Sequence, residues 1–167
     1  QELVKGSFLE CKPIIPVSSV NGEGIQELRM ALKNLQKEQR SPNLDNPFRL
    51  FIDRSFSIKG FGTVVTGTVL SGTFSVDEEV HQYPQKKNIR VRGIQIHGRK
   101  YQTVQAGSRA ALNLAGISQD AVRRGDQLGA PKSLLSSYML NVELEVLEAV
   151  PIDLKQKARI RFHLGSR

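Results

Sequence analysis

The chain has 167 residues, of which 39% are hydrophobic and 24% are charged, and its formal net charge is +8 at pH 7. This composition is typical of a globular chain that buries a core, and no apolar run approaches the roughly 20 residues that a membrane helix requires. The chain begins at Gln1 without an apolar signal segment, so we expect a cytoplasmic protein and a sequence taken from a longer one.

The first 47 residues contain a predicted strand, a predicted helix and a predicted linker. Residues 13–20 are mostly apolar and predict a short strand, which the loop at 21–24 ends. The following residues, ending before Arg40, predict an amphipathic helix whose apolar stripe is Ile25, Leu28, Leu32 and Leu35. The prolines and polar residues of 41–47 indicate a linker between domains.

Beyond the linker the hydrophobic period changes from helical to alternating, which is typical of β-strands. Phe48, Leu50 and Ile52 share one strand face, and a β-branched run follows at 62–72. Further strands are predicted at 79–83, 88–97, 103–114 and 127–129. Short strands separated by Gly, Pro and Asp turns indicate a mainly β fold with a small antiparallel barrel over residues 48–131.

The last part of the chain predicts two more strands, at Tyr138–Val150 and Ala158–Leu164. Two strands cannot close a barrel, and an isolated hairpin is only marginally stable in water. We therefore predict that residues 132–167 are the start of a further β-domain, after the segments 1–40, 41–47 and 48–131.

No residue pattern predicts catalysis or metal binding. Gly62–Thr68 has the glycine spacing of a phosphate loop, but Thr68 stands where the lysine belongs and the run does not enter a helix. The single cysteine, Cys11, excludes an intramolecular disulfide, and the 3 histidines have no partner at metal-ligand spacing. The sequence therefore predicts a binding module rather than an enzyme.

Positive charge is concentrated in the predicted barrel, where residues 44–131 hold 12 Lys and Arg against 7 Asp and Glu. Arg90 and Arg92 are two residues apart and are expected to project from one strand face, near His97 and Tyr101. The complete set of candidate nucleic-acid-binding residues is Lys86, Lys87, Arg90, Arg92, Arg99 and Lys100. Such a basic ridge suits contact with a phosphate backbone, and an ordinary solvated strand face explains it equally well.

A further arginine, Arg109, lies in the alternating segment 106–114. One predicted face holds Ala110, Leu112 and Leu114, and the other holds Arg109, Ala111 and Asn113. Because its alanine neighbours are small, Arg109 can stand in a shallow groove. A solvent-facing arginine is the alternative.

Several segments resemble one family of proteins. Phe48–Thr68, with its core at Phe56–Gly67, is similar to the start of domain II of translational GTPases such as elongation factor Tu. Three segments, Ile52–Phe56, Ala106–Leu114 and Arg124–Asp126, resemble the selenocysteine-specific elongation factors more particularly, and His163–Gly165 resembles early domain III of that family. The resemblance covers the chain from about Pro13 to its end.

This resemblance implies a fold and indicates which parts of the protein bind nucleotide. It implies a Greek-key barrel, preceded by a strand and helix of an α/β GTPase domain and followed by the first strands of a second barrel. Pro16–Ser19 resembles the last guanine-contacting motif, so Ser18 and Ser19 are the nucleotide contacts implied for this chain. The phosphate loop, the switch segments and the base-specificity motif are absent from the sequence. We therefore expect a fragment without catalysis or cofactor, whose full-length parent binds GTP and Mg²⁺.

The resemblance also implies a substrate, the aminoacyl end of a transfer RNA, with pocket residues at Asp53, Arg54 and Arg109. A selenol is more acidic than a thiol, so selenocysteine arrives as an anion, whereas serine on the same RNA is neutral. The two guanidiniums are expected to bind the selenolate, while Asp53 orients an arginine or accepts the substrate α-amino group. In a straight strand Asp53 and Arg54 point to opposite sides, so the pocket requires a bend or bulge.

The implied partners are selenocysteinyl-tRNA, the ribosome and, through C-terminal domains outside this sequence, an mRNA hairpin; no membrane contact is expected. The alternative is domain II of another translational GTPase, either Tu-like or initiation-type. That domain would act as a structural adaptor and contact ribosomal RNA through Lys86, Lys87, Arg90 and Arg92. In that case Arg109 is incidental.

Overall fold

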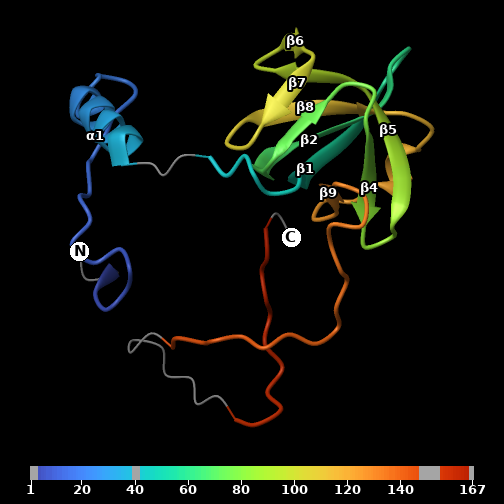
Figure 1. Ribbon diagram of the computed structural model, residues 1–167. Helices are drawn as coiled ribbons and strands as arrows, with labels where there is room; N and C mark the ends of the chain where they lie inside the picture. The colour runs from blue at the N-terminus through green and yellow to red at the C-terminus, as the bar shows by residue number, and fades with distance from the viewer. Residues whose placement is uncertain (1–3, 39–41, 147–154, 166–167) are drawn as a thin grey trace. The chain divides into compact units, whose positions relative to one another are not determined.

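The computed structural model describes residues 4–38, 42–146 and 155–165 of the chain, which fall into two compact units (Figure 1). One unit contains the helix α1 (Ile25–Glu38), and the other contains every strand of the described residues. None of the described helices has the length and apolar character needed to cross a membrane.

The helix α1 confirms the amphipathic pattern of the sequence. It follows Gly24, whose φ of +70° favours glycine and where a Cβ would lie 2.0 Å from the carbonyl oxygen of Pro16. Glu27 lies in the first turn, where a negative charge is favourable at the positive end of the helix dipole. The loop and the start of the helix are therefore specified locally.

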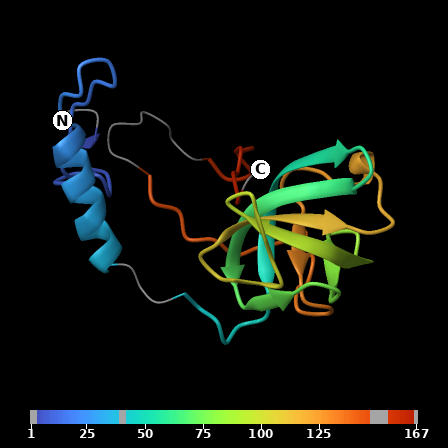
Figure 2. The same cartoon turned by 90° about the horizontal axis from the view of Figure 1, so that it is seen from above.

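The β unit is a closed antiparallel barrel, as Figure 2 shows from a second direction. Its strands follow one another around the ring in the order β4-β9-β1-β2-β8-β5, and pairing of β5 with β4 closes the ring. The strands are β1 (Arg49–Ile58), β2 (Gly62–Ser71), β4 (Glu79–Tyr83), β5 (Lys87–Ile96), β8 (Arg109–Leu114) and β9 (Gln127–Gly129). This arrangement confirms the mainly β fold with a small antiparallel barrel.

Short elements complete the barrel unit. Strand β6 (Arg99–Tyr101) pairs with the end of β5, and β3 (Thr73–Ser75) pairs with β7 (Thr103–Gln105) in a separate two-stranded sheet. A single 3₁₀ turn, η2 (Gln119–Ala121), precedes β9. Sequence alternation did not predict β3 or β6, because three residues are too few to establish a period of two. The predicted strand 103–114 is two strands, β7 and β8, separated by a turn at 106–108.

The core consists of the inward residues of the ring strands together with residues of the separate sheet of β3 and β7. The largest side chains with almost no exposure are Leu50, Ile52, Val65, Val69, Val80, Val91, Ile94, Val104, Leu112 and Leu128. Three polar side chains, Thr63, Gln82 and Asp126, are buried with them. The alternation predicted for 48–52 and for 110–114 therefore separates core residues from outward residues.

Three predicted strands are not observed. No strand is assigned to residues 13–18, 138–146 or 158–164. The remaining part of the prediction for 138–150, residues 147–150, lies outside the described residues. These segments have the apolar composition of strands, but no described segment pairs with them. A strand requires a neighbour to satisfy its backbone N–H and C=O groups, so composition alone does not form one. The predicted domain boundaries stay predictions.

Candidate functional site

The candidate site lies on the outer face of β1, β2 and β8, which we define as the side turned away from the barrel core. The pairing register places side chains of this face in rows that cross the three strands. Phe51, Thr68 and Arg109 form one row, and Arg54, Thr66 and Ala111 form the next. Arg54 and Arg109 therefore lie on the same face, in adjacent rows, with β2 between them.

A β-bulge at Asp53 brings a third charged side chain to this face. Ile52 pairs with Gly67 and Arg54 pairs with Thr66, so Asp53 has no opposite residue on β2. Ile52 is buried in the core, whereas Arg54 is exposed. The extra residue allows the side chains of Asp53 and Arg54 to lie on the same surface, although the two residues are adjacent in sequence.

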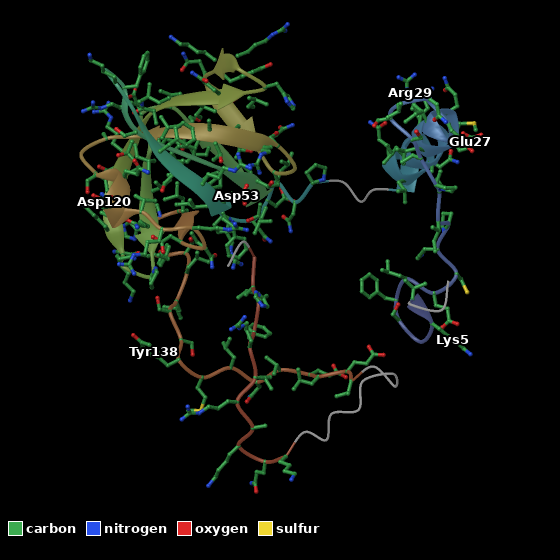
Figure 3. The ribbon with its side chains drawn as sticks, turned by 180° about the vertical axis from the view of Figure 1, so that it is seen from behind. Lys5, Glu27, Arg29, Asp53, Asp120 and Tyr138 are labelled. Carbon is green, nitrogen blue, oxygen red and sulfur yellow. The ribbon has the colours of Figure 1, made fainter. Side chains whose placement is uncertain are left out.

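Asp53 and Arg109 form an ion pair across the outer face, between Asp53 Oδ2 and Arg109 Nη1. The Arg109 side chain remains 52% exposed, and the Asp53 side chain is 28% exposed. Figure 3 labels Asp53 on the barrel. Among the described residues Arg54 forms no ion pair and no side-chain hydrogen bond, so its guanidinium is available to a ligand.

Arg109 lines a shallow groove of about 240 Å³ whose other walls come from β2, β8 and the β5–β6 turn. The lining residues are Thr66, Gln95, His97, Gly98, Arg109, Ala110 and Ala111. The Thr66 hydroxyl is buried without a hydrogen-bond partner among the described residues. A buried hydroxyl of this kind is costly unless it is satisfied, so it suits a polar ligand atom entering the groove.

A second groove of about 380 Å³ adjoins the first and shares Gln95 and Ala111 with it. Its walls combine aromatic and aliphatic side chains, including Phe56, Phe61 and Val64, with the cations of Arg92 and Lys100. A flat apolar wall beside cations is the arrangement that nucleic-acid bases and their phosphates prefer.

A further polar group lies in this second groove. The side chain of Asn113 donates to the carbonyl of Phe61 over 2.7 Å, while its Oδ1 is buried without a partner among the described residues. The groove therefore offers an acceptor as well as an apolar wall.

The predicted basic ridge is divided between two places. Arg92 and Lys100 line the second groove, and Arg99 precedes Lys100 on β6. Lys86 lies in the β4–β5 turn, Lys87 begins β5, and Arg90 is paired with Asp77 at 3.0 Å. All of these side chains are exposed. Only part of the ridge therefore faces the candidate site, because β5 changes its pairing partner from β4 to β8 along its length.

The predicted nucleotide contacts Ser18 and Ser19 lie in the other unit, in the loop before α1. The Ser18 amide donates to the carbonyl of Glu23 over 3.0 Å, and its hydroxyl accepts from the amide of Asn21. Both serines precede a helix, as the resemblance implies, and their role in nucleotide binding stays a prediction.

The sequence analysis placed Asn113 on the outward face of its strand but did not single out Thr66, Gln95 or Phe61 as groove residues. Thr66 and Asn113 alternate with core residues, so their outward direction was accessible from the sequence. Their burial was not, because it depends on the neighbouring strands. Across the parts of the chain that the structure describes, no group of His, Cys, Asp and Glu residues is arranged to hold a metal ion.

Comparison with known proteins assigns the barrel to a class. Residues 62–129 match the family model of elongation factor Tu domain 2. The closed antiparallel barrel and this match identify the β unit as domain II of a translational GTPase, a member of the elongation factor Tu domain 2 family.

Within that class the chain is similar to one particular kind of factor. It is 40% identical over its full length to the selenocysteine-specific elongation factor of Desulfomicrobium baculatum, of which it covers 26%. A crystal structure of a bacterial selenocysteine-specific elongation factor superposes with a TM-score of 0.67 at 35% identity, covering 74% of this chain and 22% of the other. The elongation factor SelB of Methanococcus maripaludis, in complex with a GTP analogue, gives 0.69 at 30% identity, covering 77% and 29%.

These similarities confirm the family resemblance that the sequence motifs predicted. The chain spans about a quarter of the length of the curated relatives that it matches most fully.

Proposed function

We propose that this chain is the aminoacyl-tRNA-binding part of a selenocysteine-specific translation elongation factor, and that the outer face of β1, β2 and β8 binds the selenocysteinyl group. The observation that carries the proposal is the placement of Arg54, Arg109 and Asp53 on one surface beside a shallow groove. A selenolate is an anion, and guanidiniums are suited to it because they are always charged and present several N–H donors.

The Asp53–Arg109 ion pair is compatible with this role. A guanidinium carries five N–H donors, so Arg109 can donate to Asp53 and to a ligand at the same time. The ion pair also limits the directions that the Arg109 side chain can take, which lowers the entropy lost on binding. The Asp53 carboxylate in turn offers an acceptor for the positively charged α-amino group of the substrate.

The expected selectivity follows from the strength of charged hydrogen bonds. A hydrogen bond to a charged group contributes about 1.5–3 kcal/mol, which corresponds to a preference of roughly tenfold to 150-fold. Serine offers a neutral hydroxyl, so it loses this contribution and leaves Arg54 without an anionic partner. Two such bonds provide discrimination without an editing reaction.

The adjoining second groove suits the nucleotide that carries the aminoacyl group. Phe56 and Phe61 supply apolar contact, and Arg92 and Lys100 supply positive charge. Contacts of this kind do not depend on the attached amino acid, so they add affinity without adding selectivity.

The test is titration of selenocysteinyl-tRNA and seryl-tRNA with Arg109→Ala and Arg54→Ala variants. We use the full chain and a chimera in which the chain replaces the matching segment of the Desulfomicrobium baculatum factor. Each variant is expected to raise the Kd for selenocysteinyl-tRNA about tenfold to 150-fold, and that for seryl-tRNA less than about threefold.

Arg92→Ala is the matched control, because it removes an arginine from the second groove of the same barrel. It is expected to raise the Kd for both RNAs by a similar factor and to reduce the salt dependence of their binding. Equal affinity of the unmutated protein for the two charged RNAs would overturn the selectivity proposal. If only Arg92→Ala has an effect, the alternative of an adaptor that contacts ribosomal RNA is favoured.

The remaining expectations concern parts of a longer protein. We propose that GTP and Mg²⁺ are bound there, with Ser18 and Ser19 as the contacts from this chain. The chain itself is proposed to have no catalytic activity. The ribosome and an mRNA hairpin are the proposed further partners, the hairpin through C-terminal domains outside this sequence.

A further inference from the structure

A buried polar bridge joins β4 to the loop that precedes β9. Gln82 is 1% exposed and Asp126 is 3% exposed, and Gln82 Nε2 donates to Asp126 Oδ2 over 2.7 Å. The same amide donates to the carbonyl of Ala121 over 2.8 Å, and Asp126 Oδ2 also accepts from the Arg123 amide over 3.0 Å. Gln82 therefore holds both ends of the segment 121–126 from inside the barrel.

This loop binds β1 immediately before the bulge. The Ile52 amide donates to the Asp126 carbonyl over 2.9 Å, and the Gly125 amide donates to the Ile52 carbonyl over 2.9 Å. Both backbone groups of the last residue before Asp53 are thus bonded to the loop.

The same loop binds β1 again just beyond the bulge. The Ser55 hydroxyl donates to the carbonyl of Val122 over 3.1 Å, and the Gln119 side chain donates to the carbonyl of Ser55 over 3.2 Å. Asp53 and Arg54 are the two residues between these attachment points. Their position on β1 is therefore set by a loop that does not belong to the proposed pocket.

We infer that Gln82 and Asp126 are positioning residues for the Asp53–Arg54 pair, and this inference rests on the proposed function of that pair. The bridge fixes the loop 119–126, and the loop holds the strand on both sides of the bulge. Val122 still packs in the apolar core, but without the bridge both ends of the segment 121–126 lose the hydrogen bonds that Gln82 donates to them. The bulge can then relax toward a regular strand, in which Asp53 and Arg54 point to opposite faces.

The geometry distinguishes this role from a general contribution to stability. The core contains many apolar residues whose loss lowers stability wherever they lie. The bridge instead connects to the backbone that carries two specific side chains. Its loss is expected to change the ratio of the two RNA affinities, which a uniform loss of stability does not change.

The variants are Gln82→Met, which keeps an unbranched side chain but removes both donated hydrogen bonds, and Asp126→Ala, which removes the acceptor. Asp126→Asn is the conservative variant, because its side-chain oxygen can still accept from Gln82 and from the Arg123 amide. Val104→Ala is the matched control, because it truncates a buried core residue on β7, which belongs to the separate two-stranded sheet.

The first measurement uses the full chain without RNA. In Gln82→Met and Asp126→Ala, the amides of Ile52 and Gly125 are expected to exchange with solvent at least about tenfold faster relative to the Val65 amide on β2. The NMR signals of the Asp53 and Arg54 amides and of the Arg109 guanidinium are expected to shift. Asp126→Asn and Val104→Ala are expected to leave both readouts close to those of the unmutated chain. Unchanged exchange and signals in Gln82→Met would overturn the inference.

The second measurement compares selenocysteinyl-tRNA with seryl-tRNA at conditions where each variant is folded. Gln82→Met and Asp126→Ala are expected to reduce the ratio of the two affinities at least about tenfold, whereas Asp126→Asn and Val104→Ala preserve it. A preserved ratio in Gln82→Met, together with a reduced ratio in Arg109→Ala, would overturn the inference while leaving the proposed function intact. If Arg109→Ala also preserves the ratio, the proposed function fails, and the exchange measurement still decides whether the bridge positions Asp53 and Arg54.

Discussion

The barrel and the segment that follows it have the same alternating apolar pattern, but the apolar side chains are buried in the barrel and exposed in the segment. Leu50 and Ile52 on β1 are 0% exposed, whereas Val142 and Leu144, with the same spacing, are each 53% exposed. Each strand of the ring has a neighbour on both sides, but residues 138–146 have no strand assignment and pair with no described segment. A segment with alternating apolar residues therefore becomes a buried strand only where neighbouring strands pair with its backbone.

The helix α1 shows the same contrast. Its pattern is clear enough to predict its existence, yet Leu32 and Leu35 are 56% and 58% exposed. Helical hydrogen bonds are internal to the segment, so a helix satisfies its backbone without a neighbouring strand, whereas an isolated strand does not. The barrel is therefore expected to account for most of the stability of the chain.

The most direct test of this contrast compares two leucines. Leu112→Ala, at a fully buried position on β8, is expected to lower the free energy of unfolding by about 2–5 kcal/mol, because it leaves a cavity in the core. Leu144→Ala is expected to change it by less than about 0.5 kcal/mol, because Leu144 is already half exposed and lies outside the barrel core. Urea denaturation measures both, and similar losses would show that residues 138–146 are part of the cooperative unit.

A second test compares two glycines of the ring, one where β1 and β2 approach closely and one with open space beside it. A Cβ at Gly67 would lie 2.0 Å from the Phe51 carbonyl oxygen and 2.7 Å from Leu50 Cδ2, so Gly67→Ala is expected to destabilise the barrel by about 1–3 kcal/mol. At Gly93 the nearest atom to a Cβ is 4.0 Å away, so Gly93→Ala is expected to stay within about 1 kcal/mol of the unmutated chain. Thermal unfolding of both variants checks the difference, and a neutral Gly67→Ala would contradict it.

The smallest expected effect concerns a surface contact within the barrel. The Asp77 and Arg90 side chains are 64% and 59% exposed, and their ion pair is 3.0 Å long. Arg90→Ala is therefore expected to lower the free energy of unfolding by less than about 1 kcal/mol, and by less still at high salt. Denaturation at low and high ionic strength measures this. A loss of several kcal/mol would mean that the barrel surface, unlike the segment after it, depends on specific charge pairs.

Much of the fold was predictable because its signals are local. The alternation of Phe48, Leu50 and Ile52 and the stripe of α1 follow from the periods of strand and helix, and the structure has both elements. The strands predicted at 13–20, 138–150 and 158–164 were wrong where the structure describes them, because partner strands are not a property of a segment. The short strands β3 and β6 were missed because they exist only through their pairing.

The candidate site was predictable in part, through the family motifs. These motifs indicated Asp53, Arg54 and Arg109, but sequence alternation alone puts Asp53 and Arg54 on opposite faces of β1. The register shift that reconciles them has no distinct sequence signal. The unpartnered Thr66 hydroxyl and the Asn113 oxygen were likewise hidden, because their burial depends on strands far away in the sequence.

The sequence by itself determined which residues can form strands, which side of each strand is apolar, and that the barrel carries an excess of positive charge. These properties follow from side-chain chemistry and from backbone periods that extend over a few residues. The tertiary structure alone decided which apolar strands are buried, and where β1 gains its extra residue. It also decided that Gln82 and Asp126 hold the loop that flanks the bulge. Those outcomes depend on hydrogen bonds and packing between residues far apart in the chain, which no local pattern encodes.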